Sequence, residues 1–583
     1  MRVLLLHPED SPRRGPWSRQ RWDLIVDLGR ASPFSEQQWS KQYGCPVLRA
    51  EVFRHGVEDA RLVRESLAIA RGRLIDEVGI DWWDVASLQI VSQALDMLVL
   101  RRVAVEIGAA DEMWATRTGW RTSLIAAICG CPVRSFGGGR LARAAAGVAH
   151  YAGLMRRFPA GQIKEIFLDK YDAGYRWRSR FAVEARHQGE PVVLLPSAYG
   201  NVSRTAADYA RMLPQQAFLL VATRRSAKQF TPPANVEVRD LGAYAAVDAP
   251  EGEVSSLLAR WTKLRAEMHA SADLRMLLQA GVLDDFPNWV RDGLCARNAW
   301  WAVLEREPVC GVLCGDDSNL YTRLPVLLAA RRKIATVDFH HGAFDGRYLL
   351  KDLACDLYLA KNEMELDYLV RVCGLAAEKI VIAAPERKDA PVGARLGPRE
   401  SASAMYFSEP YEAAGLRTEE VYRELLPGLV RVARESGRRL IVKLHPFESR
   451  TERSRMVQEV LSPEDAELVT LLDGPLTSEL MSRAWFGITV ESSTALDCQE
   501  NGVRCFLCGW LATSPYEYMQ QYARFGVGEM VERAEHIGEI PTRLANRATR
   551  AALPERSTTV DREDLLRWLT SSVQERCGAR SAS

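Results

Sequence analysis

Two segments in the last third of the chain carry most of the information about its fold: LIVKLHP at residues 440–446 and FGITVESST at residues 486–494. Each is a short apolar run followed at once by polar residues. Near-continuous apolar runs of this length are typical of parallel strands that are buried on both faces of a sheet. Open α/β sheets bind ligands at the carboxyl ends of such strands. The two segments therefore predict parallel strands whose ends carry a ligand site.

The residues that end these runs suit a phosphate group. Ser492, Ser493 and Thr494 favour the N-cap of a helix, where free backbone N–H groups meet the positive end of the helix dipole. His445, at the end of the other run, would hold a second phosphate oxygen. In a protein without a ligand, the same residues would cap a helix and open a loop. Because both clusters follow predicted strands, we favour a nucleotide-phosphate site.

Apolar runs alternate with longer amphipathic stretches along the whole chain, which is the pattern of α/β architecture. The chain has 583 residues, too many for one ordinary domain. We divide it into an N-terminal α/β region of unassigned role at residues 1–185, a second domain at 186–388 and a third at 389–583. The last two are expected to be Rossmann-like and to face a cleft.

The expected strands are the apolar runs that turn signals or polar residues bound. They lie at residues 2–6, 23–28, 112–115, 132–136, 191–196, 217–222, 309–314, 334–339, 357–360, 380–383, 404–407, 440–444, 468–472, 486–490 and 503–507. A linker rich in Pro, Gly and charge is expected at 386–400, and a C-terminal helix at 562–574 that packs back across the cleft.

Composition narrows the class of protein. A hydrophobic content of 47% and a charged content of 26% are those of a globular protein, and a net charge of +1 argues against nucleic-acid binding. No run approaches the roughly 20 apolar residues that span a bilayer, and the N-terminal run is too short for a signal peptide. We expect a cytoplasmic protein and leave peripheral attachment to the inner face of the membrane open. The 12 cysteines lack zinc spacing, so neither metal nor cofactor is expected.

Three further loops follow predicted strands of the second domain. Paired acids such as those after residue 314 suit a general base, and histidines such as those after residue 339 suit a base or a phosphate ligand, with a glycine for close approach. Solvated loops and packed histidines are the plain alternatives. The first loop offers Asp316 and Asp317, and the second offers His340, His341 and Gly342. The third is the turn after residue 196, which would bind the acceptor or a phosphate through Gly200, Asn201 and Ser203.

The motifs of the second and third domains resemble those of a known enzyme family. Lys443-Leu444-His445-Pro446 followed by Glu491-Ser492-Ser493-Thr494 resembles the HP and SS motifs of bacterial GT-B glycosyltransferases that use CMP-activated sugars, the sialyltransferases and Kdo transferases among them. Asp316-Asp317-Ser318 resembles their paired-acid motif, with Ser318 where the family has Gly. The resemblance implies a GT-B-like fold. It also implies that the HP histidine and the SS hydroxyls contact the nucleotide phosphate, and that an acid of the second domain deprotonates the acceptor.

The resemblance spans residues 186–583. It leaves three functions open, two of them enzymatic and one non-catalytic. The favoured function is transfer of an acidic sugar from a CMP donor onto a surface-polysaccharide or glycolipid acceptor. The order His-His-Gly, Lys-Leu-His-Pro, Ser-Ser-Thr is also similar to CDP-glycerol glycerophosphotransferases, in which case His341 would be the base. A non-catalytic assembly protein of the same fold is the third alternative.

Overall fold

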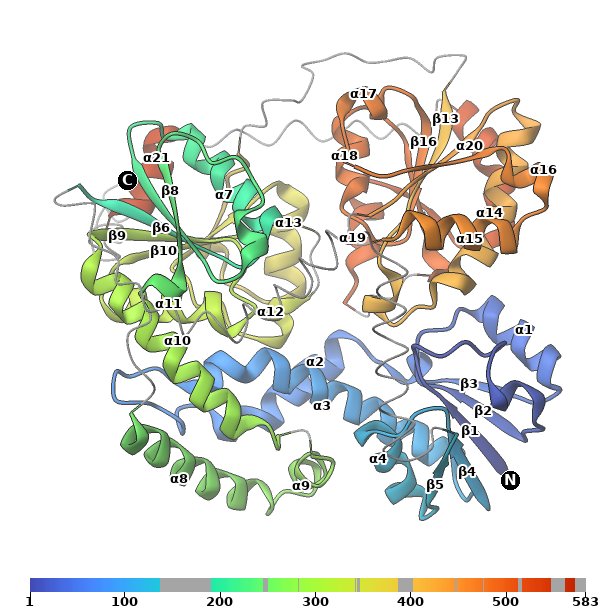
Figure 1. The fold of residues 1–583 in the computed structure, drawn as a ribbon, viewed down its shortest axis with the longest axis horizontal. Coiled ribbons are helices and arrows are strands. Elements are labelled where there is room, and N and C mark those ends of the chain that lie inside the picture. The colour runs from blue at the N-terminus through green and yellow to red at the C-terminus, as the bar shows by residue number, and fades with distance from the viewer. Residues whose placement is uncertain are drawn as a thin grey trace. The chain divides into compact units, whose positions relative to one another are not determined.

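A computed structural model gives the fold of the chain (Figure 1). It describes residues 1–136, 190–244, 250–281, 283–340, 342, 346–385, 402–445, 448–474, 476–511, 516–546 and 561–571. Contacts within the chain define two units, each built from separated stretches. Unit 1 comprises Met1–Asp59, Asp96–Ala160 and Lys388–Pro554, and unit 2 comprises Ala60–Leu95, Gly161–Arg387 and Glu555–Ser583.

Unit 1 contains two sheets in which all the strand pairs are parallel. The first has the order β3-β2-β1-β4-β5 and consists of β1 (Arg2–Leu6), β2 (Leu24–Asp27), β3 (Val47–Arg49), β4 (Glu112–Ala115) and β5 (Val133–Ser135). The third has the order β15-β14-β13-β16-β17-β18 and consists of β13 (Ser403–Phe407), β14 (Leu440–Lys443), β15 (Val469–Leu472), β16 (Ala484–Thr489), β17 (Cys505–Cys508) and β18 (Glu529–Val531).

Helices flank both sheets of unit 1. They are α1 (Pro33–Tyr43), α4 (Trp120–Cys129), α14 (Thr418–Glu435), α15 (Arg450–Val460), α16 (Pro463–Ala466), α17 (Ser478–Met481), α18 (Thr494–Glu500), α19 (Tyr518–Arg524) and α20 (Ile540–Ala545). The apolar face of α14 packs on the third sheet and forms much of one core cluster with it. We use "third domain" for the described residues 402–546.

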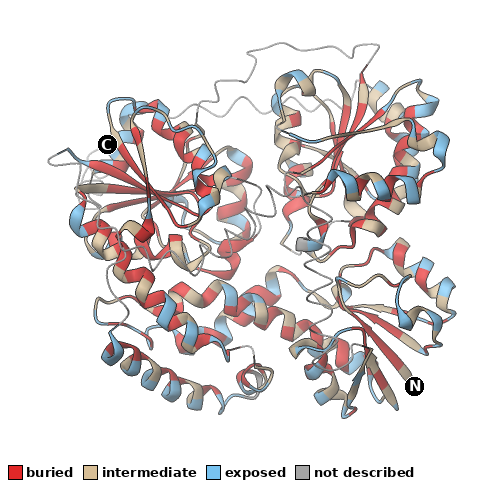
Figure 2. Cartoon of the chain, in the orientation of Figure 1, coloured by how far each residue is buried: buried red, intermediate tan, exposed pale blue. Residues whose placement is uncertain are grey.

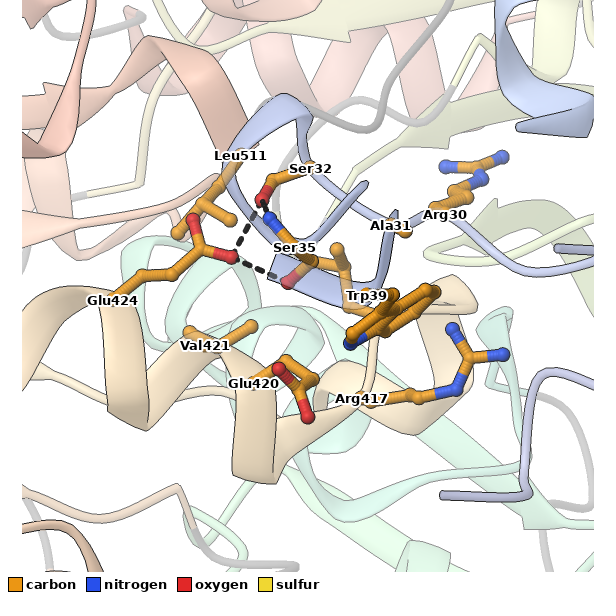
Figure 3. Close-up of a pocket in the computed structure, with 11 residues that line it drawn as sticks. Arg30, Ala31, Ser32, Ser35, Trp39, Arg417, Glu420, Val421, Glu424 and Leu511 are labelled. Carbon is orange, nitrogen blue, oxygen red and sulfur yellow. Dashed lines mark hydrogen bonds between the residues drawn. The ribbon is translucent and has the colours of Figure 1, made fainter. Parts of the chain in front are cut away.

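Within unit 1, buried polar contacts join the third domain to the first sheet. Arg417 donates a hydrogen bond to Asp27 Oδ1 at 2.6 Å, and both side chains are buried. Glu424 on α14 accepts from Ser32 Oγ at 2.5 Å and Ser35 Oγ at 2.7 Å, at the start of α1 (Figure 3). A small pocket at this contact is lined by Arg417, Glu424, Ser32 and Ser35, among other residues. The first sheet is therefore held against the third domain by ion pairs and hydrogen bonds.

Unit 2 contains the second sheet, again all parallel, with the order β12-β11-β10-β9-β6-β7-β8. Its strands are β6 (Val192–Ser197), β7 (Ala217–Ala222), β8 (Val236–Asp240), β9 (Val309–Cys314), β10 (Ala335–Phe339), β11 (Leu357–Ala360) and β12 (Ile380–Ile382). Its helices are α7 (Gly200–Met212), α8 (Glu251–Met268), α9 (Ala272–Gln279), α10 (Phe286–Arg306), α11 (Leu320–Arg331), α12 (Arg347–Leu350), α13 (Glu363–Asp367) and α21 (Arg562–Thr570). We use "second domain" for residues 190–385.

The unit boundaries differ from the three blocks expected from the sequence. They fall inside α2 (Val57–Leu67) and α3 (Trp82–Ile107), so residues 60–95 belong with the second domain although they are part of the N-terminal block. A buried ion pair between Arg297 and Asp76, 2.9 Å long, is one contact that fixes this segment there. The C-terminal helix α21 also returns to the second sheet, where Leu565 and Leu569 are fully buried in its core.

All three sheets place their first strand centrally, and the strand order reverses between β1 and β4, β6 and β9, and β13 and β16. This is the order of Rossmann-like folds, whose ligands bind at the carboxyl ends of the strands beside the reversal. Figure 2 shows the central strands buried, as the apolar runs predict. The expected α/β class, with two Rossmann-like domains preceded by a further α/β region, is confirmed. Among the described helices, none has the length and apolar content needed to cross a membrane.

Candidate functional site

The carboxyl edge of the third sheet brings both sequence motifs to one place in the fold. His445 lies just after β14, and residues 490–494 follow β16. β13 lies between these two strands, and Ser408 and Glu409 directly follow it. The strand order reverses at this point, so the motifs flank the position where a Rossmann-like sheet binds its ligand. Pro446 lies outside the described residues.

His445 is anchored through its backbone. Its N–H donates to Glu448 Oε2 at 2.7 Å, and Glu448 Oε1 accepts from Ser408 Oγ at 2.8 Å and from Arg453 Nε at 2.7 Å. Burial, and then the charge of Lys443, lower the pKa of the His445 imidazole. The imidazole is therefore neutral at physiological pH, and it would meet a phosphate as a hydrogen-bonding group.

Lys443 ends β14 and is buried. Its Nζ donates to the Leu444 carbonyl oxygen at 2.7 Å. Burial lowers the pKa of the amine, while Asp473 and Glu448 oppose that effect. The side chain therefore folds back on its own strand end and contributes positive potential beneath His445.

Glu409, which belongs to neither sequence motif and was not predicted as a site residue, bonds the turn that precedes the Ser-Ser-Thr cluster. One oxygen, Oε1, accepts from Thr489 Oγ1 at 2.8 Å, Val490 N at 3.1 Å and Glu491 N at 2.9 Å. Burial raises the pKa of its carboxyl to about 7, against the lowering effect of these hydrogen bonds. The signal was present, because Glu409 follows an apolar strand in the same way as His445 does.

The Ser-Ser-Thr cluster begins α18, as predicted, but its capping differs. Ser493 occupies the N-cap position without a capping bond from its side chain, and Ser492 Oγ instead accepts from Thr494 N at 3.3 Å. The Thr494 hydroxyl oxygen is buried and has no hydrogen-bond partner among the described residues. A buried hydroxyl without a partner is costly, and a ligand atom would satisfy it.

In the second domain, Asp316 and Asp317 follow β9 beside the reversal of that sheet. Asp316 Oδ1 accepts from Arg347 Nη1 at 2.9 Å and from Ser318 N at 3.0 Å. Ser318 stands where the resembled family has Gly, and its hydroxyl is buried without a partner in the described part of the chain. Asp316 is therefore ion-paired but lies next to an unsatisfied polar atom.

Asp317 has different surroundings. It is fully buried, its Oδ2 accepts from Arg323 Nη1 at 2.5 Å, and its Oδ1 is bonded to Lys351 Nζ. Burial alone would raise the pKa of Asp317, but the charges of Lys351 and Arg323 outweigh it and lower the pKa. The carboxylate is therefore held in its ionised form between two cations. The sequence did not identify these partners, because they come from later segments.

The histidine loop follows β10. His340 is buried directly after the strand, and the Gly342 carbonyl accepts from Lys361 Nζ at 3.0 Å. His341 lies outside the described residues. Glu365, buried near the end of β11 and unforeseen from the sequence, accepts from Lys361 N. Burial raises the pKa of Glu365 to about 7, against the effect of Lys361.

The turn after β6 is mainly structural. Ser203 is fully buried, and its hydroxyl bonds Ser197 Oγ at 2.7 Å and the Ala227 carbonyl at 2.6 Å. A Cβ on Gly200 would lie 3.0 Å from the Ser226 carbonyl, so this glycine allows a close approach of the backbone within the fold. Asn201 is exposed. Of this group, only Asn201 presents a side chain to solvent.

Comparisons with known proteins are limited to structure. No family model matches the chain, and no curated protein matches it either. Among solved structures, the UDP-GlcNAc 2-epimerase of Methanocaldococcus jannaschii, in complex with UDP-GlcNAc and UDP, is 12% identical and covers 61% of this chain and 93% of its own, with a TM-score of 0.38. A glycosyltransferase of Rickettsia africae is 11% identical, with coverages of 67% and 97% and a TM-score of 0.37. The HepE protein of Anabaena, in complex with UDP, is 11% identical, with coverages of 67% and 100% and a TM-score of 0.35.

Proposed function

We propose that the protein is a glycosyltransferase that binds a nucleotide-sugar donor at the carboxyl edge of the third sheet. One observation carries the proposal: His445 and the Ser492–Thr494 cluster follow strands on either side of β13. Ser408 bonds to the loop after β14, and Glu409 bonds to the loop after β16. The resemblance of the two motifs to those of CMP-sugar-dependent transferases supports a CMP-linked acidic sugar as donor.

The proposed chemistry places the leaving phosphate against hydrogen-bond donors. The neutral His445 imidazole and the hydroxyls of Ser492, Ser493 and Thr494 would bond its oxygens, and Lys443 would add positive potential near His445. Groups fixed in advance toward a developing charge are the largest source of stabilisation in many transfer reactions. The proposed reaction needs neither a metal ion nor a cofactor.

We assign the general base to Asp316. Asp317 is fully enclosed between Lys351 and Arg323, so it has no free position from which to take a proton from an acceptor. Asp316 pairs with Arg347, and no second cation pairs with it among the described residues, so one of its carboxylate oxygens is less enclosed than those of Asp317. The acceptor would be a surface-polysaccharide or glycolipid hydroxyl, met in the cytoplasm or at the inner face of the membrane.

The polyol-phosphate transferase remains a second candidate because of one observation. Both acids after β9 are ion-paired, and His340 directly follows the adjacent strand β10, in the His-His-Gly loop that resembles CDP-glycerol glycerophosphotransferases. In that reaction the base would be a histidine of this loop, and the nucleotide site would be unchanged.

Donor hydrolysis separates the alternatives. The purified chain would be incubated with CMP-, UDP- and CDP-linked donors without an acceptor, and the products would be separated by chromatography. Sugar release from a CMP donor is the expected result. Release of glycerol phosphate from CDP-glycerol would replace the proposal with the second candidate, and no release from any donor would favour a non-catalytic protein. Asp316→Asn should lower turnover by about 10²–10⁴-fold without affecting donor binding.

A further inference from the structure

The turn after β16 is held by a single acidic side chain from a neighbouring strand. Glu409 Oε1 accepts hydrogen bonds from the Thr489 hydroxyl, Val490 N and Glu491 N, at 2.8, 3.1 and 2.9 Å. Two of these three donors are backbone N–H groups, which would otherwise point toward a bound anion at the end of the strand. The protein thus fills part of its own anion site with a carboxylate.

The hydrogen bonds to Glu409 fix the start of the Ser-Ser-Thr cluster that follows the turn. Ser492 is bonded to Glu491 in the chain, so the position of the Glu491 N–H determines where the Ser-Ser-Thr cluster begins. Ser492 Oγ then accepts from Thr494 N, and the Thr494 hydroxyl is left buried without a partner among the described residues. A ligand phosphate is therefore directed past residues 490 and 491 toward the hydroxyls.

Ser408, the residue before Glu409, is connected to the other motif through Glu448. Ser408 Oγ donates to Glu448 Oε1 at 2.8 Å, and Glu448 Oε2 accepts from His445 N at 2.7 Å. The dipeptide Ser408-Glu409 therefore sets the positions of both motif loops from the central strand. Neither residue belongs to the motifs themselves.

We propose that Glu409 is a positioning residue of the donor site, whose carboxylate occupies the end of β16 and thereby directs the donor phosphate to Ser492, Ser493 and Thr494. This inference rests on the proposed function. Glu409 acts through the turn and does not touch the reacting atoms, so it affects donor affinity before it affects chemistry.

The charge of Glu409 adds a second, separable effect. Burial raises the pKa of its carboxyl to about 7, and the nearby charge of Glu491 acts in the same direction. Tyr411 and Cys508 also lie close enough for the charge of Glu409 to affect them. An ionised Glu409 repels a phosphate, so affinity should fall as the pH rises through about 7. A neutral side chain that keeps the acceptor oxygen should abolish that part of the pH dependence.

The test is calorimetric titration of CMP into wild type, Glu409→Gln, Glu409→Asp and Glu409→Ala at about pH 6 and pH 8. Glutamine retains an oxygen that can accept the three bonds, so its affinity should stay within about threefold of wild type, with a weaker pH dependence. Aspartate is too short to reach the turn, and it should bind at least tenfold more weakly, as should alanine. His445 and the CMP phosphate titrate in all four proteins. The difference between their pH profiles of CMP affinity therefore reports the effect of the residue at position 409.

Glu424→Ala is the matched control. Glu424 is also a buried carboxylate of unit 1, and it accepts three hydrogen bonds, from Ser32, Ser35 and Trp510. Its loss should lower the melting temperature without changing CMP affinity. Wild-type affinity in Glu409→Asp, or equally weak binding by Glu409→Gln and Glu409→Asp, would overturn the inference alone. If neither CMP nor UDP binds to wild type, the proposed function fails and the inference fails with it.

Discussion

Individual side chains show where the sequence was informative and where it was not. The order of strands and polar residues located His445, Ser492 and Asp316 at strand ends, because the carboxyl ends of parallel strands lie on one edge. It did not show that Asp317 is enclosed, because the enclosure depends on Arg323 and Lys351. Arg323 lies six residues after Asp317 and Lys351 lies 34 residues after it, and both contacts are fixed by packing that no local sequence pattern records.

This difference predicts separate effects for the two acids. Asp317→Asn removes the charge that two buried cations surround, and breaking a buried ion pair costs about 3–5 kcal/mol. We expect Asp317→Asn to lower the melting temperature markedly, while the turnover of the remaining folded protein changes little. Asp316→Asn should show the reverse pattern. The account of the two acids is wrong if Asp317→Asn loses turnover at unchanged stability.

Glu365 predicts a pH effect on stability. Its pKa is raised to about 7 by burial, so the folded state favours the protonated form. The stabilisation is complete below the ordinary pKa of about 4.5 and is lost as the pH rises through about 7. Glu365→Gln stays neutral, so its melting temperature should equal that of wild type near pH 5 and exceed it near pH 8. A parallel pH profile for the two proteins would rule out an ionising buried Glu365.

Among the secondary-structure elements, the strands that the sequence missed share one property. β3, β8 and β18 all lie at the edge of their sheets. Edge strands are covered on fewer sides and commonly carry charges: β8 reads VEVRD and β18 reads EMV. Their sequences therefore lack the continuous apolar run by which the central strands were found.

The packing of α21 on the second sheet predicts a strong effect for one glycine. A Cβ on Gly311, in β9, would lie 1.7 Å from the Leu569 carbonyl oxygen, and the backbone of α21 would have to move. Gly311→Ala should therefore displace α21 and expose Leu565 and Leu569. We expect a lower melting temperature and faster proteolysis after residue 560. Gly252→Ala is the control: a Cβ there meets nothing within 4 Å, so this variant should behave like wild type. Gly437→Ala is less suitable, because Gly437 has a φ of 63° and an alanine there would be strained.

The whole molecule repeats one strand order three times, and the three copies have different surroundings. The carboxyl edge of the first sheet contacts the third domain, since Arg417 bonds the His7 and Asp10 carbonyls and Asp27 at the ends of β1 and β2. The second sheet presents acids paired with cations. Only the third combines a neutral histidine, clustered hydroxyls and an unsatisfied buried Thr494 oxygen within the described residues. We therefore propose that the donor site lies there.

Titration of CMP into wild type and His445→Ala tests this assignment most directly. Loss of a hydrogen bond to a charged group costs about 1–3 kcal/mol, so the variant should bind about 5–150-fold more weakly. Ser492→Ala with Ser493→Ala should weaken binding to a similar extent. Equal melting temperatures would show that the fold is intact. The account predicts a measurable wild-type affinity that both variants reduce, and undiminished CMP binding by folded His445→Ala would contradict it.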